Sequence, residues 1–146
     1  MINAVDTVVR EAALLEPLLS WLRGRRVLRD DTVIVSELPW YGRRVDLAIL
    51  NRSNMTTAYE LKLRQTRRAL EQGALNSLSF DRSYIVTASK PSQRNLVQAV
   101  QLGVGVILIS PDSGRASALL VAPQGRVNPT VRNRLHSAMT STSRHR

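Results

Sequence analysis

The stretch RRVDLAILNRSNMTTAYELKL, residues 43–63, combines two apolar runs with charged side chains, and this combination is the strongest indication of the fold. Residues 44–50 and 56–63 are rich in aliphatic and β-branched residues, which is typical of strands, and residues 51–54 read as a turn. Side chains alternate between the faces of a strand, so pairing these strands as a hairpin would place Asp46 and Glu60 on one face, with Lys62 one step along. Because a carboxylate is costly to remove from water unless it is paired or metal-bound, the stretch predicts a functional site on a sheet.

The flanking sequence predicts an α/β sandwich around a mixed sheet. Apolar residues recur at helical spacing over residues 3–23, and Pro17 is expected to kink or interrupt this helix because it lacks an N–H. We expect strands over residues 32–38, 44–50, 56–63, 83–88, 104–110 and 116–121, the last at an edge, and further helices over residues 65–78, 92–102 and 129–138.

Length and composition bound the domain organisation. The chain has 146 residues and no cysteine, which suits one domain and excludes a disulfide framework and Cys-ligated metal sites. We expect residues 1–138 to form a single domain and residues 139–146 to form a basic, disordered tail. The longest apolar run, residues 102–109, is far shorter than the ~20 residues that span a bilayer. With no sign of a secretory signal, we expect a cytoplasmic protein without a membrane partner.

The charge indicates a polyanionic partner. Lys and Arg number 21 against 11 Asp and Glu, which gives a net charge of +10. Such a balance favours nucleic acid, although a basic protein from an arginine-rich proteome would show it too. The segment after Asp112 carries six Arg and no carboxylate. Only two of the 21 basic residues are Lys, and one of them, Lys62, stands two residues after Glu60.

Asp46 followed by Glu60-Leu61-Lys62 resembles the D…(D/E)-X-K pattern of the PD-(D/E)XK nuclease superfamily. The resemblance implies an αβββαβ, restriction-endonuclease-like core with a mixed central sheet flanked by helices, covering about residues 1–110. The remaining residues would add a C-terminal β/α extension. The proline of the family pattern is absent, since Val45 precedes Asp46. Two further residues resemble parts of the pattern in some branches, Glu37 upstream and Gln72 in the following helix.

What the resemblance implies is metal-dependent hydrolysis of phosphodiester bonds in DNA. Asp46 and Glu60, with the carbonyl of Leu61, would hold Mg²⁺, for which Mn²⁺ can substitute. Lys62 would position the attacking water or stabilise the charge that develops on the phosphate. Glu37 would join through a second metal or an outer-shell water, and Gln72 would be a further catalytic residue.

Arginines near these segments are the candidate nucleic-acid contacts. They are Arg43, Arg44, Arg64, Arg67 and Arg68. A nuclease of this size often needs a second copy to cut both strands, so we also expect a homodimer.

Several alternatives stay open at the level of sequence. The acidic pair and Lys62 could form an ion-pair cluster on a solvated face, and Glu37 could pair with neighbouring arginines. Glu11 is either an active-site carboxylate, as in some relatives, or part of a wet helix face. The polar stripe Gln65, Arg68, Gln72 and Asn76 could line a groove or face solvent. The protein as a whole could be a non-catalytic nucleic-acid-binding module or a basic subunit that binds an acidic protein.

Overall fold

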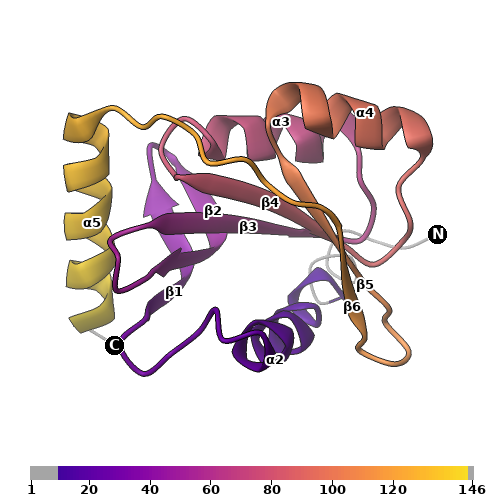
Figure 1. The fold of residues 1–146 in the computed structure, drawn as a ribbon, viewed down its shortest axis with the longest axis horizontal. Helices are drawn as coiled ribbons and strands as arrows, with labels where there is room; N and C mark the ends of the chain where they lie inside the picture. Colours follow the sequence, from indigo (N-terminus) through magenta and orange to yellow (C-terminus); the bar gives the residue numbers. More distant parts are fainter. Residues whose placement is uncertain (1–9, 145–146) are drawn as a thin grey trace.

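The structure, a computed structural model, describes residues 10–144. A six-stranded mixed sheet forms its centre, with the strands in sequential order (Figure 1). The first three strands form an antiparallel meander, the third to fifth run parallel, and the sixth returns antiparallel to the fifth. The strands are β1 (Val33–Trp40), β2 (Arg43–Leu50), β3 (Thr56–Lys62), β4 (Arg82–Thr87), β5 (Gly105–Ile109) and β6 (Ala116–Leu120).

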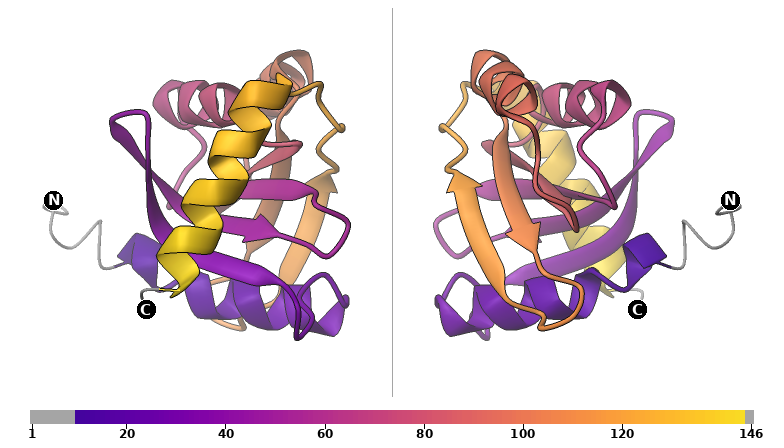
Figure 2. Two further views of the ribbon diagram at one scale, coloured as in Figure 1. Left: turned by 90° about the vertical axis from the view of Figure 1, so that its left-hand side faces the viewer. Right: turned by 90° about the vertical axis from the view of Figure 1, so that its right-hand side faces the viewer.

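Helices cover both faces of the sheet (Figure 2). Helix α2 (Leu15–Gly24) packs its leucines on one face, against apolar side chains of β2, β3, β4 and β5. The opposite face is shared by α3 (Arg67–Asn76) and α4 (Gln93–Leu102), which pack over β4 and β5, and by α5 (Pro129–Arg144), which packs over β1 and β2. The expected αβββαβ core with a mixed sheet flanked by helices, and its C-terminal β/α extension, is confirmed.

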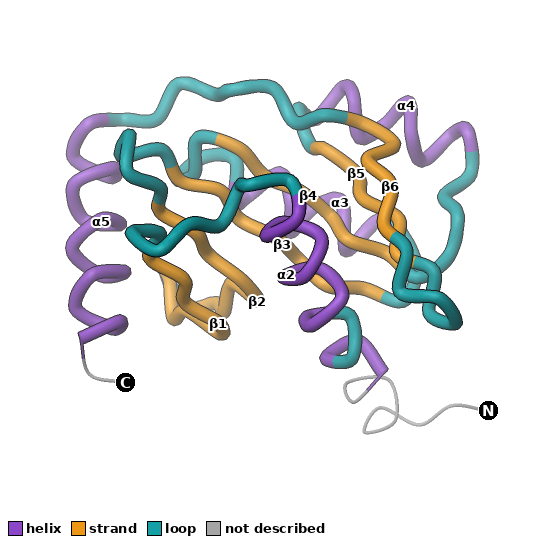
Figure 3. Tube along the Cα trace, turned by 60° about the horizontal axis from the view of Figure 1, so that its bottom comes forward, coloured by secondary structure: helices purple, strands orange, loops and turns teal. Residues whose placement is uncertain are grey.

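The predicted helix over residues 3–23 is interrupted, as Pro17 indicated. Residues 10–12 are helical, residues 13–14 form a turn, and α2 then begins at Leu15 (Figure 3). Pro17 therefore falls in the first turn of α2, where the backbone N–H groups have no partner within the helix and a missing one costs little. Residues 3–9 of the predicted helix lie outside the described residues.

Residues 139–144, which the sequence placed in a basic, disordered tail, are helical in the structure. Helix α5 continues to Arg144, because Leu135 and Met139 stand one turn apart and both are fully buried against β1 and β2. The polar residues that follow Met139 concealed this continuation in the sequence.

A buried carboxylate ties α5 to the sheet. Asp81 is 1% exposed and accepts hydrogen bonds from the backbone N–H and the hydroxyl of Thr56, at 2.8 and 3.2 Å. The guanidinium of Arg132, on α5, donates to both carboxylate oxygens of Asp81. Arg132 is therefore occupied in holding the helix, although it belongs to the arginine-rich segment after Asp112.

Within residues 10–144, no helix combines the length and the apolar character that crossing a membrane requires.

Candidate active site

The pairing of β2 with β3 stops where the two carboxylates would face each other. The paired positions run from Leu50↔Thr56 to Leu47↔Tyr59, and the same register would next bring Asp46 opposite Glu60. At that position the backbone N–H of Leu61 donates instead to the carboxylate of Asp46, at 2.7 Å. The side chain of Asp46 thus takes the place of a backbone partner and is held at the carboxyl end of β3.

Strand β1 is distorted beside the same residue. Glu37 has a φ of 54°, a left-handed conformation that is unfavourable for a residue other than glycine. Val35 and Leu38 stand an odd number of residues apart, yet both pack into the cluster beneath α5, together with Val45 of the neighbouring strand. The alternation of side chains between the two faces of the sheet is therefore broken at Glu37 on β1. It is broken in the same way at Asp46, the residue opposite Glu37 on β2. Backbone distortion of this kind is concentrated at functional sites.

Glu60 is the buried member of the acidic pair. Its side chain is 2% exposed, and Nδ2 of Asn76 donates to its Oε1 at 2.9 Å. Burial raises the pKa of Glu60 to about 8, with further increases from the charge of Asp46 and from a side-chain hydrogen bond with it. The hydrogen bond from Asn76 and the charge of Lys62 lower this pKa in part. Glu60 therefore binds a proton readily at neutral pH when no metal ion is beside it.

Asn76 joins the acidic pair to the hairpin that connects β1 and β2. It is fully buried at the end of α3, and its Oδ1 accepts a hydrogen bond from Nη1 of Arg43 at 3.0 Å. Arg43, which the sequence predicted as a nucleic-acid contact, directs Nη1 of its guanidinium to Asn76. Nothing in the sequence distinguished Asn76 from its polar neighbours except its position one turn after Gln72 on the helix.

Glu11 and Lys62 complete the site from the other layer. Oε2 of Glu11 lies 3.9 Å from Nζ of Lys62, and their side chains are 22% and 26% exposed. Burial raises the pKa of Glu11, the charge of Lys62 opposes that increase, and the charge of Asp46 adds to it. Glu11 is thus close enough to Lys62 and Asp46 for their charges to affect its pKa. Of its two interpretations, a residue of the site or part of a wet helix face, the geometry supports the first.

The other predicted catalytic residues take different positions. Gln72 is half-buried on α3, one turn before Asn76, and its buried Oε1 has no hydrogen-bond partner among the described residues. Glu37 is exposed on β1, at the position that the register of β1 and β2 places opposite Asp46. The polar stripe is divided, because Gln65 and Asn76 are buried while Arg68 faces solvent.

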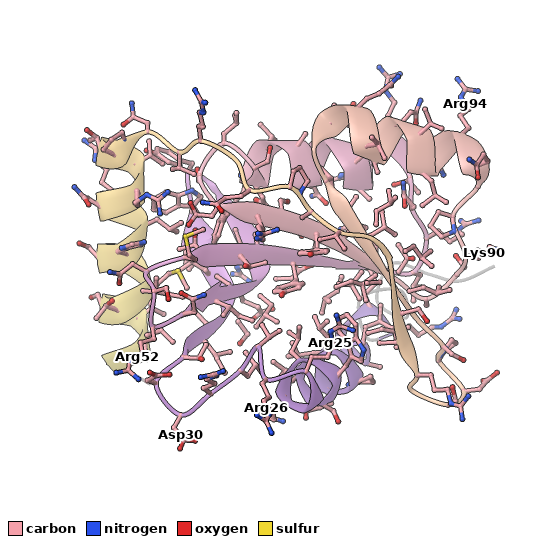
Figure 4. The ribbon with its side chains drawn as sticks, viewed as in Figure 1. Arg25, Arg26, Asp30, Arg52, Lys90 and Arg94 are labelled. Carbon is pink, nitrogen blue, oxygen red and sulfur yellow. The ribbon has the colours of Figure 1, made fainter. Side chains whose placement is uncertain are left out.

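Exposed cations surround the carboxyl ends of the parallel strands. The predicted contacts Arg64, Arg67 and Arg68 follow β3 directly, and Arg67 is paired with Glu71 at 3.4 Å on the surface. Lys90, in the segment between β4 and α4, and Arg94, in the first turn of α4, follow the next parallel strand and project outward (Figure 4). Parallel strands end at the same edge, so these cations lie along the edge that holds Lys62. Arg44, on the hairpin, is exposed as well.

The residues present fit a magnesium ion by their chemistry. Asp46 and Glu60 supply two carboxylates and Leu61 a backbone carbonyl, and Mg²⁺ usually binds one or two carboxylates together with waters and substrate phosphate. Within residues 10–144 there is no group of three or more His, Cys, Asp or Glu side chains that could hold a metal ion. Any ion here would depend on this pair and on solvent or substrate oxygens for its remaining ligands.

Fold and site together define an α/β protein with a carboxylate pair and a lysine at the carboxyl end of the central strand β3. The model of the bacteriophage P4 protein cII family matches residues 4–143, and the chain belongs to that family. No curated protein matches the chain.

Solved structures are similar to the chain at low identity. A protein of unknown function from Silicibacter pomeroyi is 18% identical with a TM-score of 0.60, over 90% of this chain and 84% of that one. A repair endonuclease from Pyrococcus abyssi is 18% identical with a TM-score of 0.47, over 62% of this chain and 44% of that one. SfsA of Pyrococcus furiosus, solved in complex with Ca²⁺, is 16% identical with a TM-score of 0.39, over 84% of this chain and 65% of that one. The first of these similarities supports the fold.

Proposed function

We propose that the protein is a metal-dependent endonuclease of the PD-(D/E)XK type that acts on DNA. The observation that carries the proposal is the buried Glu60 placed beside Asp46, with Lys62 and Glu11 at the same end of β3. A protein rarely buries one carboxylate against another unless the arrangement has a use, because each disfavours the ionised form of the other.

Each residue has a distinct part in this proposal. Asp46, Glu60 and the carbonyl of Leu61 would hold Mg²⁺, which when bound lowers the pKa of a water molecule and polarises the scissile phosphate. Lys62 directs a compact positive charge at the phosphate oxygens, where negative charge develops in the transition state. Glu11 orients the ammonium of Lys62 through their ion pair.

Two further residues predicted from the sequence, Gln72 and Glu37, would act at the edge of the site. The amide of Gln72 has an unpartnered oxygen, which can accept a hydrogen bond from a bound water or a sugar hydroxyl. Glu37 lies on the strand next to Asp46 and is exposed, so it can hold an outer-shell water rather than bind the same ion directly. The exposed cations at the strand ends would bind the phosphate backbone.

A cleavage assay tests the proposal. Supercoiled plasmid, a branched junction and single-stranded DNA are each incubated with the protein in Mg²⁺, Mn²⁺ or EDTA. We expect metal-dependent cleavage that Glu60→Gln and Lys62→Ala abolish while DNA binding is retained. Glu16→Gln, the same chemical change at an exposed position of α2, is the matched control and should cut like the wild type. Cleavage that persists in both site variants would refute the assignment.

The alternative is a nucleic-acid-binding module without catalytic activity on the same fold. It is favoured by the fact that most of the charge of the cluster is offset without a metal, since burial raises the pKa of Glu60 to about 8 and Glu11 is paired with Lys62. Calorimetric titration with Mn²⁺ separates the two functions. Binding that is lost in Asp46→Asn supports the nuclease, whereas no binding in the presence or absence of DNA supports the module.

A further inference from the structure

The hairpin that connects β1 and β2 presents an aromatic ring to solvent. The chain has two Trp, three Tyr and one Phe, all of them among the described residues, and Tyr41 is the one that is exposed, at 62%. Its ring meets that of Trp40 edge to face, with the centroids 4.7 Å apart and the planes at 73°. Trp40 itself is 7% exposed. The buried indole thus supports Tyr41 while most of the tyrosine stays open to solvent.

The backbone at Tyr41 does not favour a tyrosine. Trp40 pairs with Arg43, so Tyr41 and Gly42 form a two-residue loop, and their φ angles are 48° and 72°. Two positive φ angles define a type I′ turn, whose first position favours Asn, Asp or Gly. A larger side chain in the left-handed region costs stability, and an exposed ring recovers little of that cost by burial. The turn therefore carries a residue that its own folding does not call for.

The turn is attached to the candidate active site. Strand β2 runs antiparallel to β3, so Arg43 at the start of β2 and Lys62 at the end of β3 lie at the same edge of the sheet. Arg43 donates to Asn76, and Asn76 donates to Glu60. The hairpin projects beyond the sheet on the side of α3 (Figure 2). Two hydrogen bonds thus fix the position of the turn relative to the buried carboxylate.

The charge around the ring suits a nucleic acid. Residues 38–45 include two arginines and no acidic residue, and the second of them, Arg44, is exposed. Proteins that bind single-stranded nucleic acid combine cations, which contact the phosphates, with exposed aromatic rings, on which the bases stack. Tyr41 and Arg44 supply this pair of groups on one hairpin. An acidic protein would be attracted by the arginines but would give the ring no partner of its own.

We propose that Tyr41 stacks on an unpaired base of the bound DNA, so that the substrate is DNA with a single-stranded segment. Both faces of a base inside a duplex are covered by its neighbours, so a ring on a turn can reach only a base that is unpaired or terminal. Tyr41 precedes Asp46 by five residues, which span roughly 17 Å at most along a strand. The base therefore lies within a few nucleotides of the phosphate at the acidic pair. This inference rests on the proposed action on DNA.

Fluorescence anisotropy in EDTA, where a metal-dependent nuclease cannot cut, tests the contact. The probes are a labelled single strand, the same strand paired with its complement, and the same strand with abasic sites in place of its bases. We expect Tyr41→Asn to weaken binding of the intact single strand by roughly tenfold. Binding of the duplex and of the abasic strand should be unchanged, because their phosphates remain while no base is free to stack. Tyr41→Phe keeps the ring and should bind like the wild type.

Stability separates stacking from a role in the turn. Asparagine suits a type I′ turn, so Tyr41→Asn should be at least as stable in urea as the wild type. Val121→Asn introduces the same residue at a position that is 72% exposed, after β6 at the opposite edge of the sheet, and should leave all three affinities unchanged. Lower stability of Tyr41→Asn, or an equal loss of affinity for the abasic strand, would overturn the inference.

Cleavage in Mg²⁺ distinguishes this inference from the proposed nuclease. Tyr41→Asn should raise KM for single-stranded DNA and leave kcat unchanged, because the ring contributes binding away from the reacting phosphate. No cleavage by any variant, with the anisotropy difference retained, would refute the nuclease and support the stacking contact. Single-stranded DNA that Tyr41→Asn binds and cuts like the wild type would overturn the contact and leave the nuclease standing.

Discussion

Nδ2 of Asn76 lies 2.9 Å from Oε1 of Glu60, so the last residue of helix α3 holds the buried carboxylate of strand β3. The other end of the same amide accepts a hydrogen bond from Arg43 at 3.0 Å. Neutral Asn76 therefore connects a guanidinium on the β1–β2 hairpin to a carboxylate beside Asp46. This connection sets the direction of Glu60, and it has consequences that can be measured.

Asn76→Ala should destabilise the protein by about 2 kcal/mol, because it leaves the buried carboxyl of Glu60 and the guanidinium of Arg43 each short of a partner. Urea unfolding, followed by circular dichroism, gives the free energy of unfolding. Asn133→Ala removes the same side chain from an exposed position on α5 and should change stability little. Equal stability of the two variants would show that the hydrogen bonds of Asn76 contribute nothing net.

The pKa of Glu60 predicts a pH dependence of stability. The folded protein binds this proton more tightly than the unfolded chain, since the pKa rises from an ordinary value of 4.5 to about 8. The contribution of Glu60 to stability is therefore complete below pH 4.5 and is lost as the pH rises towards about 8. Urea midpoints measured in EDTA should fall over this range for the wild type. Glu60→Gln, which stays neutral, should flatten that decline, and an unchanged slope would contradict the assignment.

Divalent metal should reverse part of that loss. A cation that binds ionised Asp46 and Glu60 stabilises the folded state by mass action and displaces the proton from Glu60. We expect Mg²⁺ or Mn²⁺ to raise the melting temperature of the wild type and not that of Asp46→Asn. Calorimetry at neutral pH in two buffers with different ionisation enthalpies should detect the released proton. A melting temperature that rises equally in both proteins would place the metal elsewhere.

The ion pair between Asp81 and Arg132 is expected to anchor α5 to the sheet. Arg132→Ala leaves the fully buried carboxylate of Asp81 without its cation, and we expect a loss of about 2 to 3 kcal/mol, discounted because the Arg132 side chain is 30% exposed. Arg134→Ala, on the exposed side of the same helix, is the control. Limited proteolysis should cut α5 faster in the first variant only. Similar rates in both would show that the ion pair does not hold the helix.

The exposed positions of Lys90 and Arg94 predict an additional contact with DNA. Each follows the parallel strand next to β3 and points outward (Figure 4), so each single replacement by Ala should lower the slope of log affinity against log salt by about 1. Fluorescence anisotropy over a range of salt concentrations measures the slope. Arg52→Ala is the control, since Arg52 lies on the turn after β2 and is 3.7 Å from Asp31. Equal slopes for all three variants would place the DNA elsewhere.

The local pattern of the sequence was sufficient for the order of the elements. Alternation in residues 44–50 and 56–63, and helical spacing before and after them, depend on contacts between neighbours in the chain. The placement of Asp46 and Glu60 on adjacent strands follows from the same periodicity and a short turn. These features were predicted correctly because side chains alternate between the two faces of a strand, and a short turn leaves few ways to pair two such strands.

The tertiary structure decided what surrounds the pair. The break in pairing at Asp46, the inversion at Glu37 and the approach of Glu11 to Lys62 depend on how whole layers pack, which no local pattern records. Asn76 was indistinguishable from a surface residue in the sequence, yet the packing of α3 buries it against Glu60. The same holds for α5, which continues past the predicted end at residue 138 and buries Met139 in the core beneath it. Sequence determined which side chains can do chemistry here, and long-range packing decided which of them meet, because burial depends on residues far apart in the chain.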